Sequence, residues 1–116
     1  MQCLNKFLNR IKINLKRSCK SKKIDYYSLQ QIIRDDNTVI LLDVRSTQEF
    51  KEGHLLGATN IPYGELKNKV SYLIPNHGQT IIVYCQMGGR SEKAVNILQK
   101  MGYTNIYQLD GGLNAI

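Results

Sequence analysis

The chain has 116 residues, of which 42% are hydrophobic and 22% charged, and a formal net charge of +7. This length suits one ordinary domain, and the hydrophobic share excludes a disordered chain. No apolar run approaches the roughly 20 residues of a membrane-spanning helix, so no transmembrane segment is expected. Three cysteines without a Cys-x-x-Cys pair exclude a disulfide framework and a zinc ribbon, and they predict a cytoplasmic protein.

The positive charge is concentrated at the front of the chain. Residues 1–23 contain eight of the 16 Lys and Arg residues and no acidic residue, whereas residues 24–116 contain eight basic and nine acidic residues. We therefore expect a basic N-terminal extension, 1–23, followed by a near-neutral domain, 24–116. The net charge is thus no argument for nucleic-acid binding by the domain, and no nucleic-acid partner is expected.

An apolar stripe runs through the basic extension, formed by Leu4, Phe7, Leu8, Ile11 and Leu15 at helical spacing. Such a basic amphipathic helix suits peripheral contact with an anionic membrane surface. It also loosely resembles an organelle presequence. A third interpretation is a docked helix whose charges only maintain solubility. The sequence alone leaves these alternatives open.

From Ile24 onward, short apolar runs alternate with helical patterns. Capping-box patterns at 28–31 and 46–49 predict the starts of two short helices, the second ending at Gly53. Further helices are expected over 65–73 and 90–101, and strands over 39–44, 58–61, 81–85 and 105–109. Strands that alternate with helices predict an α/β fold, in which a parallel sheet is covered on both faces.

Cys85 is the candidate nucleophile of the chain. It ends the apolar run 81–85, and parallel α/β sheets place ligand sites at the carboxyl ends of their strands. Gly88 and Gly89 let the following loop turn its amides toward one point, and the helix expected from Arg90 adds its positive end. These features favour a thiolate, the reactive form of cysteine. The alternative is an inert buried cysteine, which would not need this loop.

Two groups of motifs resemble the rhodanese domain in their order and spacing. The first is Asp43-Val-Arg, then Glu49-Phe, Gly53-His and Gly57-Ala-Thr-Asn-Ile-Pro. The second is Val83-Tyr-Cys-Gln-Met-Gly-Gly-Arg-Ser, then Gly102-Tyr and Leu109-Asp-Gly-Gly. The likeness covers residues 24–116. It implies a three-layer α/β/α architecture around a central, mainly parallel, five-stranded sheet.

This resemblance implies a single-domain sulfurtransferase of the thiosulfate:cyanide type. Cys85 would take a sulfane sulfur from thiosulfate or a persulfide donor and pass it to cyanide, a thiol or a protein acceptor. Asp43 and His54 are expected to be structural, and no metal or organic cofactor is implied. The implied substrate-binding residues are Gln86, Met87, Gly88, Gly89, Arg90 and Ser91, with Arg45 at the rim of the site.

Loop length separates this chain from related phosphatases. Four residues lie between Cys85 and Arg90, whereas dual-specificity phosphatases and arsenate reductases of the same fold have a longer loop that fits a tetrahedral oxyanion. We therefore expect sulfur transfer rather than phosphate chemistry. The resemblance ends at Ile116, where many relatives have a Trp. We expect that face to be uncapped or covered by the N-terminal extension.

Two other functions remain open. The first is a rhodanese-like interaction or persulfide-carrier module, anchored by its basic extension. The second is a redox-sensing thiol, which needs a resolving partner such as Cys3 or Cys19. The intact Cys85 and its loop favour the enzyme, because non-catalytic modules of this family often lack the cysteine.

Overall fold

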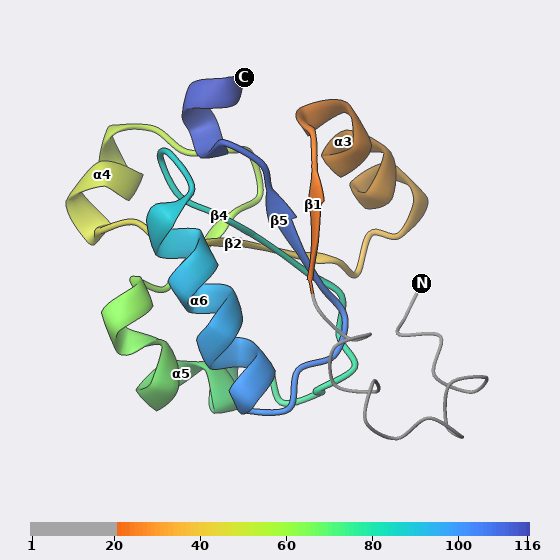
Figure 1. Cartoon of the computed structure of the whole chain (residues 1–116), viewed down its shortest axis with the longest axis vertical. Helices are drawn as coiled ribbons and strands as arrows, with labels where there is room; N and C mark the ends of the chain where they lie inside the picture. Colours follow the sequence, from red (N-terminus) through yellow and green to blue (C-terminus); the bar gives the residue numbers. More distant parts are fainter. Residues whose placement is uncertain (1–20) are drawn as a thin grey trace.

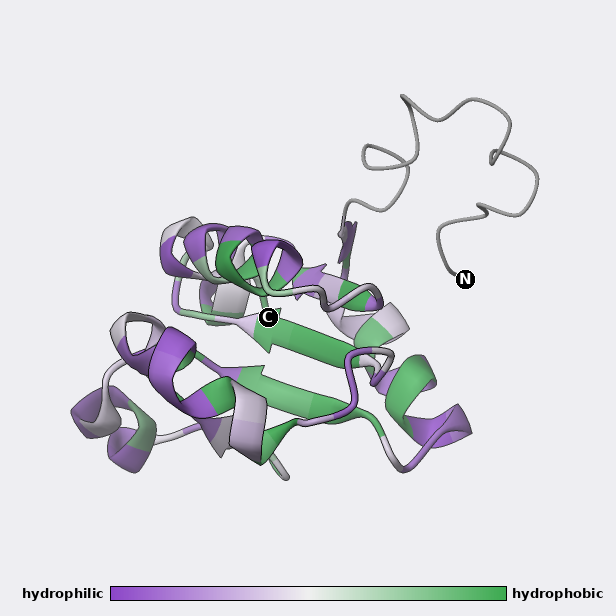
Figure 2. Ribbon diagram, turned by 90° about the horizontal axis from the view of Figure 1, so that it is seen from below, coloured by the Kyte–Doolittle hydropathy of each residue, from purple (hydrophilic) through white to green (hydrophobic). Residues whose placement is uncertain are grey.

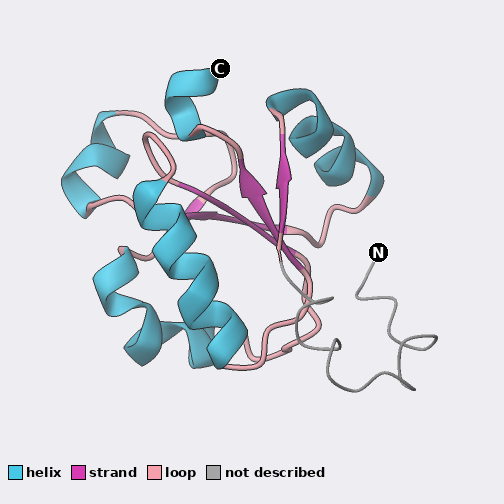
Figure 3. Ribbon diagram, in the orientation of Figure 1, coloured by secondary structure: helices cyan, strands magenta, loops and turns pink. Residues whose placement is uncertain are grey.

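The computed structural model describes residues 21–116, which form a central sheet with helices on both sides (Figures 1 and 3). Its strands are β1 (Lys22–Ile24), β2 (Ile40–Asp43), β3 (Thr59–Asn60), β4 (Ile81–Tyr84) and β5 (Ile106–Leu109). The α-helices of this part of the chain are α3 (Tyr26–Asp35), α4 (Thr47–Glu52), α5 (Leu66–Leu73) and α6 (Gly89–Lys100). Two short 3₁₀ helices, η2 (Tyr63–Glu65) and η3 (Gly112–Ala115), accompany them.

Neighbouring strands of this sheet are parallel, and their order is β1-β5-β4-β2-β3. Parallel strands require crossover connections, and these carry the helices onto the two faces. The predicted α/β fold with a five-stranded, mainly parallel sheet is therefore confirmed.

Alternate side chains of the central strands fill two hydrophobic cores. Leu42 and Val83 belong to the core that contains residues of α5 and α6, whereas Leu41 and Ile82 belong to the core that contains residues of α3. Strands that are buried on both faces read as continuous apolar runs, which explains why the sequence pattern located them. Figure 2 shows the hydrophobic central strands between helices that carry many hydrophilic residues. This arrangement confirms the three layers.

The two predicted capping boxes have different outcomes. At α4 the Ser46 hydroxyl accepts from the Glu49 amide (3.1 Å) and the Glu49 carboxylate accepts from the Ser46 amide (3.0 Å), so the prediction is confirmed. At α3 the prediction is wrong, because Asp25 is the N-cap and its carboxylate accepts from the Ser28 amide at 2.8 Å. A carboxylate satisfies that amide and also suits the positive end of the helix. The helix therefore begins earlier, at Tyr26.

The front of the chain is described only in part. The predicted amphipathic helix, with Cys3 and Cys19, lies outside the described residues. Lys22 and Lys23, which the charge pattern places in the extension, belong to β1 and pair with Tyr107 and Gln108 of β5. The edge strand thus starts before Ile24. No helix within residues 21–116 combines the length and the apolar character that crossing a membrane requires.

Candidate functional site

Cys85 follows directly after β4, which has a neighbouring strand on each side. Its side chain is buried, with 1% exposed. The short loop 86–88 leads from it into α6. Gly88, the N-cap of α6, has φ of +123°, a conformation that favours glycine. Strand, loop and helix therefore meet at the cysteine as the sequence predicts.

The sulfur of Cys85 lies among hydrogen-bond donors from the loop and the first turn of α6. The amides of Gly88 and Ser91 donate to Sγ at 3.1 and 3.4 Å. The Ser91 hydroxyl oxygen lies 3.6 Å from the sulfur. Donors that converge on one atom stabilise negative charge there, and the positive end of the helix acts in the same direction.

These donors decide the ionisation of the cysteine. Burial raises the pKa of the Cys85 thiol, but the hydroxyl and amide of Ser91 and the amides of Gly88 and Met87 outweigh it and hold this pKa below its ordinary value. A lower pKa means a larger thiolate fraction at neutral pH. Since the thiolate is the nucleophilic form, the geometry prepares Cys85 to attack.

Arg90 forms a bidentate ion pair with Glu49 of α4. Its Nη1 and Nη2 donate to the two carboxylate oxygens at 2.6 and 3.0 Å. The hydrogen bond from Arg90 lowers the pKa of Glu49 to about 2. The positive charge that the resemblance assigns to donor binding is therefore matched by a carboxylate. Sequence reasoning missed Glu49 as a partner because 41 residues separate the two.

Arg45 lies in the interior, with 4% of its side chain exposed. Its guanidinium donates to the Asp43 carboxylate at 2.7 Å, to the Gly53 carbonyl at 2.6 Å and to Oε1 of Gln86 at 3.2 Å. A buried cation needs such partners, which explains its inward direction. Arg45 thus reaches the loop from the interior, through Gln86, and its expected part in substrate binding stays a prediction. Arg45 ties β2 to the loop that follows Cys85.

The other residues of the expected site have varied surroundings. The Gln86 carboxamide accepts from Arg45 and donates to Asn114 at 2.7 Å. Met87 is 70% exposed, and Gly89 is the first residue of α6. His54 stacks on the ring of Phe50, with centroids 3.6 Å apart, at the end of α4. This position suits the structural role expected for His54.

The segment after β5 holds the loop, a contact that sequence reasoning missed. The amides of Leu113 and Asn114 donate to the carbonyl oxygens of Cys85 and Gln86, each at 3.0 Å. Gly112 has φ of +66°, and a Cβ at this position would come within 2.6 Å of those same carbonyl groups. The Gly-Gly pair after β5 is the available signal, because adjacent glycines often mark a close backbone approach.

Gln108 of β5 was missed as well. Its Nε2 donates to Ser91 Oγ at 2.9 Å and to the Gly88 carbonyl at 3.3 Å. The alternation of β5 is the available signal, since it places Gln108 on the same face as Ile106, toward α6. A glutamine on a core-facing position needs hydrogen-bond partners.

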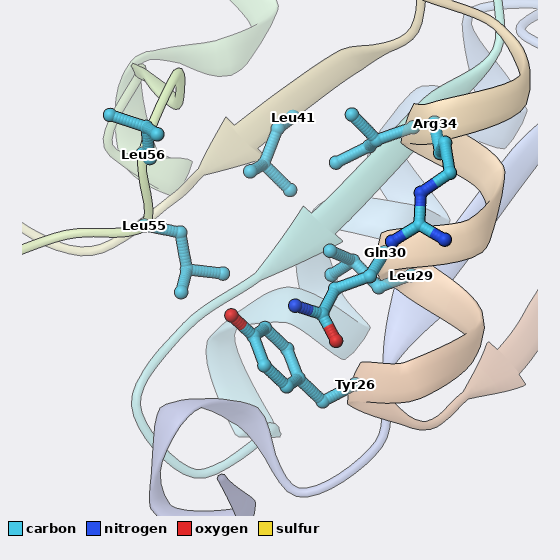
Figure 4. A pocket seen from close by; sticks show the side chains of 8 residues that line it. Tyr26, Leu29, Gln30, Arg34, Leu41, Leu55 and Leu56 are labelled. Carbon is cyan, nitrogen blue, oxygen red and sulfur yellow. The ribbon is translucent and has the colours of Figure 1, made fainter.

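A separate groove of about 380 Å³ lies on the α3 side of the sheet. Figure 4 shows Leu29 and Arg34 of α3 on one side of it, and Leu55 and Leu56 on the other. Its described lining includes no residue of the loop 86–91 and no cysteine or histidine. The groove therefore adds no chemistry to the Cys85 site.

Known proteins resemble this chain in sequence and in structure. The thiosulfate sulfurtransferase PspE of Escherichia coli is 39% identical over 75 residues, which are 65% of this chain and 71% of that protein. The putative sulfur carrier protein YrkF of Bacillus subtilis is 29% identical over 91 residues, 78% of this chain and 48% of that protein. The human single-domain sulfurtransferase TSTD1 superposes with a TM-score of 0.72 at 25% identity, covering 82% of this chain and 94% of that one. The family model of the rhodanese-like domain matches residues 25–116, which include the Cys85 loop and η3. The chain therefore belongs to this family.

Proposed function

We propose that this protein is a sulfurtransferase that carries a sulfane sulfur as a persulfide on Cys85. The observation that carries the proposal is the set of donors around Cys85. Its sulfur accepts hydrogen bonds from the amides of Gly88 and Ser91, and these donors hold the pKa of the thiol below its ordinary value. Thiosulfate is the proposed donor, supported by the likeness to a protein named for that substrate. Cyanide, a small thiol or a protein thiol accepts the sulfur.

In the first half-reaction, the Cys85 thiolate attacks the outer sulfur of thiosulfate. A bond forms between these two sulfur atoms, and the bond to the sulfonate group breaks and leaves its electron pair on sulfite. The product is a persulfide with its negative charge on the outer sulfur. Donors fixed in place before the reaction, as at Gly88 and Ser91, stabilise such charge without reorganisation.

In the second half-reaction, cyanide or an acceptor thiolate attacks the outer sulfur of the persulfide. The sulfur–sulfur bond breaks, and its electron pair returns to Cys85 as the thiolate. Thiocyanate or a new persulfide leaves, and the starting protein is restored. Sulfite leaves before the acceptor attacks, so the cycle is ping-pong, and electrons balance within each half-reaction, so it needs no further reactant.

Intact mass spectrometry after incubation with thiosulfate tests the proposal. We expect the protein to gain one sulfur atom that cyanide removes, with an equal amount of thiocyanate formed. Cys85→Ser should gain none, whereas a variant with Cys3→Ser and Cys19→Ser should gain one like the wild type. Absence of cyanide-labile sulfur on the wild type, or its survival in Cys85→Ser, would refute the persulfide on Cys85.

A persulfide carrier that serves a partner protein is the second candidate. The exposed Met87 beside the cysteine and the likeness to a protein named a putative sulfur carrier favour it. The two candidates share the first half-reaction and differ in the acceptor. Single-turnover discharge of the loaded protein, with cyanide and with a reduced protein dithiol at equal concentration, distinguishes them. Faster discharge to the protein dithiol supports the carrier, and faster discharge to cyanide supports the small-molecule enzyme.

A further inference from the structure

Gln108 is a polar side chain at a core position of β5, with 3% exposed. Ile106, two residues earlier on the same face, belongs to the core that contains residues of α6. A carboxamide in such a place loses its hydrogen bonds to water and must replace them. The partners of its Nε2 are Ser91 Oγ at 2.9 Å and the Gly88 carbonyl at 3.3 Å. Both belong to the residues that surround the Cys85 sulfur.

The hydroxyl of Ser91 has one proton and two acceptors within reach. The Gly88 carbonyl oxygen lies 3.0 Å from Ser91 Oγ, and the Cys85 sulfur lies 3.6 Å from it. A hydroxyl donates to one acceptor at a time, although its oxygen accepts from others. Each further donor on the Gly88 carbonyl therefore favours donation of the Ser91 hydroxyl proton to the thiolate instead.

Two other donors are available to the Gly88 carbonyl. The amide of Glu92 donates to it at 3.1 Å within α6, and Nε2 of Gln108 approaches it at 3.3 Å. A carbonyl oxygen has two lone pairs, so these two donors fill it. Nε2 of Gln108 also donates to Ser91 Oγ. The Ser91 oxygen then acts as an acceptor toward Gln108, and the hydroxyl proton is left for the Cys85 sulfur.

We propose that Gln108 is a positioning residue for Cys85. By donating one amide proton to the Gly88 carbonyl and the other to Ser91 Oγ, it commits the Ser91 hydroxyl proton to the Cys85 sulfur. The consequence for sulfur transfer rests on the proposed function, but the effect on the thiol does not.

The charged groups around the loop do not account for the effect of Gln108 on the Cys85 thiol. Gln108→Met replaces one neutral side chain with another of similar length, so it changes none of these charges. Neither β5 nor η3 has an Asp, Glu, Lys, Arg, His or Cys residue. The groups concerned are two ion pairs, a tyrosine and two exposed carboxylates. They are Arg90–Glu49 from α6 and α4, Asp43 of β2 with Arg45 just after it, Tyr84 of β4, and Glu92 and Asp110.

Titration of the Cys85 thiolate by its ultraviolet absorbance, with no sulfur donor present, tests the proposal. The full chain carries Cys3→Ser and Cys19→Ser, so that Cys85 is its one thiol, and the Cys85→Ser counterpart supplies the baseline. We expect Gln108→Met to move the titration midpoint to higher pH. Alkylation by iodoacetamide at neutral pH should slow about three- to tenfold, the size expected from one weakened hydrogen bond to a charged group.

A double-mutant cycle with Ser91→Ala shows whether Gln108 acts through the serine. With Ser91→Ala present, Gln108→Met should add little further shift, because the proton it positions is gone. Gln79→Met is the matched control. Gln79 lies just before β4, at the opposite end of this strand from Cys85, and its carboxamide donates to the Thr38 carbonyl. It should leave the midpoint unchanged.

The proposal is overturned if a folded Gln108→Met variant keeps the wild-type midpoint, or if the shift is equally large with and without Ser91. Thermal unfolding identifies variants that do not fold. If Gln108→Met does not fold, Gln108→Asn provides the same test, because its side chain is one methylene shorter and holds the amide farther from Ser91 and Gly88. Because no donor is used, failure of the persulfide proposal would leave this result readable.

Discussion

At the scale of residues, one carboxylate sets the charge beside the Cys85 loop. Glu49 Oε1 accepts from the Ser46 amide, which caps α4, and also from Nη1 of Arg90. The same side chain therefore anchors a helix and neutralises the cation that follows the loop. The proposed thiosulfate donor would meet an ion pair rather than a free guanidinium, which weakens long-range attraction.

Glu49→Gln is expected to lower the KM for thiosulfate about two- to fivefold at low ionic strength, because it removes the charge that neutralises Arg90 while the glutamine oxygen still caps α4. The gain should shrink as salt is added. Steady-state kinetics at low and high salt measure both effects. Glu52→Gln removes the same charge from the same helix and should change KM less. An unchanged KM in Glu49→Gln would contradict a contact between Arg90 and the donor.

The Glu49–Arg90 pair also makes stability depend on pH in acid. The pKa of Glu49 is lowered from 4.5 to about 2, so its stabilisation is complete above 4.5 and is lost as the pH falls toward 2. Between these values the Tm of the wild type should fall more steeply than that of Glu49→Gln. The difference is small, since a third of each side chain is exposed. Thermal unfolding by circular dichroism checks this, and parallel curves would contradict it.

At the scale of elements, η3 supports the Cys85 loop through its backbone. Its backbone amides donate hydrogen bonds to the carbonyl oxygens of Cys85 and Gln86, and the amides of the loop face the sulfur. The close approach depends on the absence of a side chain at Gly112. An element without ionisable groups thereby shapes the reactive site.

Gly112→Ala should destabilise the protein by about 2 kcal/mol or more, because it combines positive φ with a backbone clash. Persulfide formation should slow as the loop shifts. Gly64→Ala is the matched control, since a Cβ there meets nothing within 4 Å and its φ is not positive. Urea unfolding and the rate of sulfur uptake measure the two effects. Equal stability of the two variants would show that η3 yields without cost.

Local patterns predicted the elements better than the site. The strands around 39–44 and 81–85 were predictable because their burial on both faces leaves a continuous apolar run. The candidate nucleophile was recognisable because Cys85 follows such a run directly and a glycine-containing loop comes next. The contacts of Glu49 with Arg90 and of Gln86 with Asn114 span 41 and 28 residues, and only the strand order brings them together. The helix start at Asp25 was missed because two capping residues compete within one turn.

At the scale of the whole molecule, the described part is nearly neutral. Six of the 16 basic residues lie in residues 1–20, which leaves ten basic residues against nine acidic ones in residues 21–116. The excess charge therefore belongs to the segment with the apolar stripe. A membrane contact through this segment, proposed from the sequence, is separable from the sulfur chemistry.

The membrane proposal predicts that the full chain sediments with anionic vesicles and that a chain without residues 1–20 does not. Each Lys or Arg near such a surface contributes about 1 kcal/mol. The deletion stops at residue 20 because Lys22 and Lys23 belong to β1. Vesicles of neutral lipid are the control and should bind neither chain. Equal partitioning of the two chains onto anionic vesicles would leave the extension without this role.

The order of strands also sets an order of events during synthesis. In the sheet β1 pairs with β5 alone, so the first described strand has no partner until the last one is made. Cys85 is translated before Gln108, Leu113 and Asn114, which position its loop. Before β5 has paired, the Cys85 loop therefore lacks the contacts of these three later residues. The surroundings of Cys85 are complete only when the later strand closes the sheet, so the proposed sulfur loading would wait until the domain has folded.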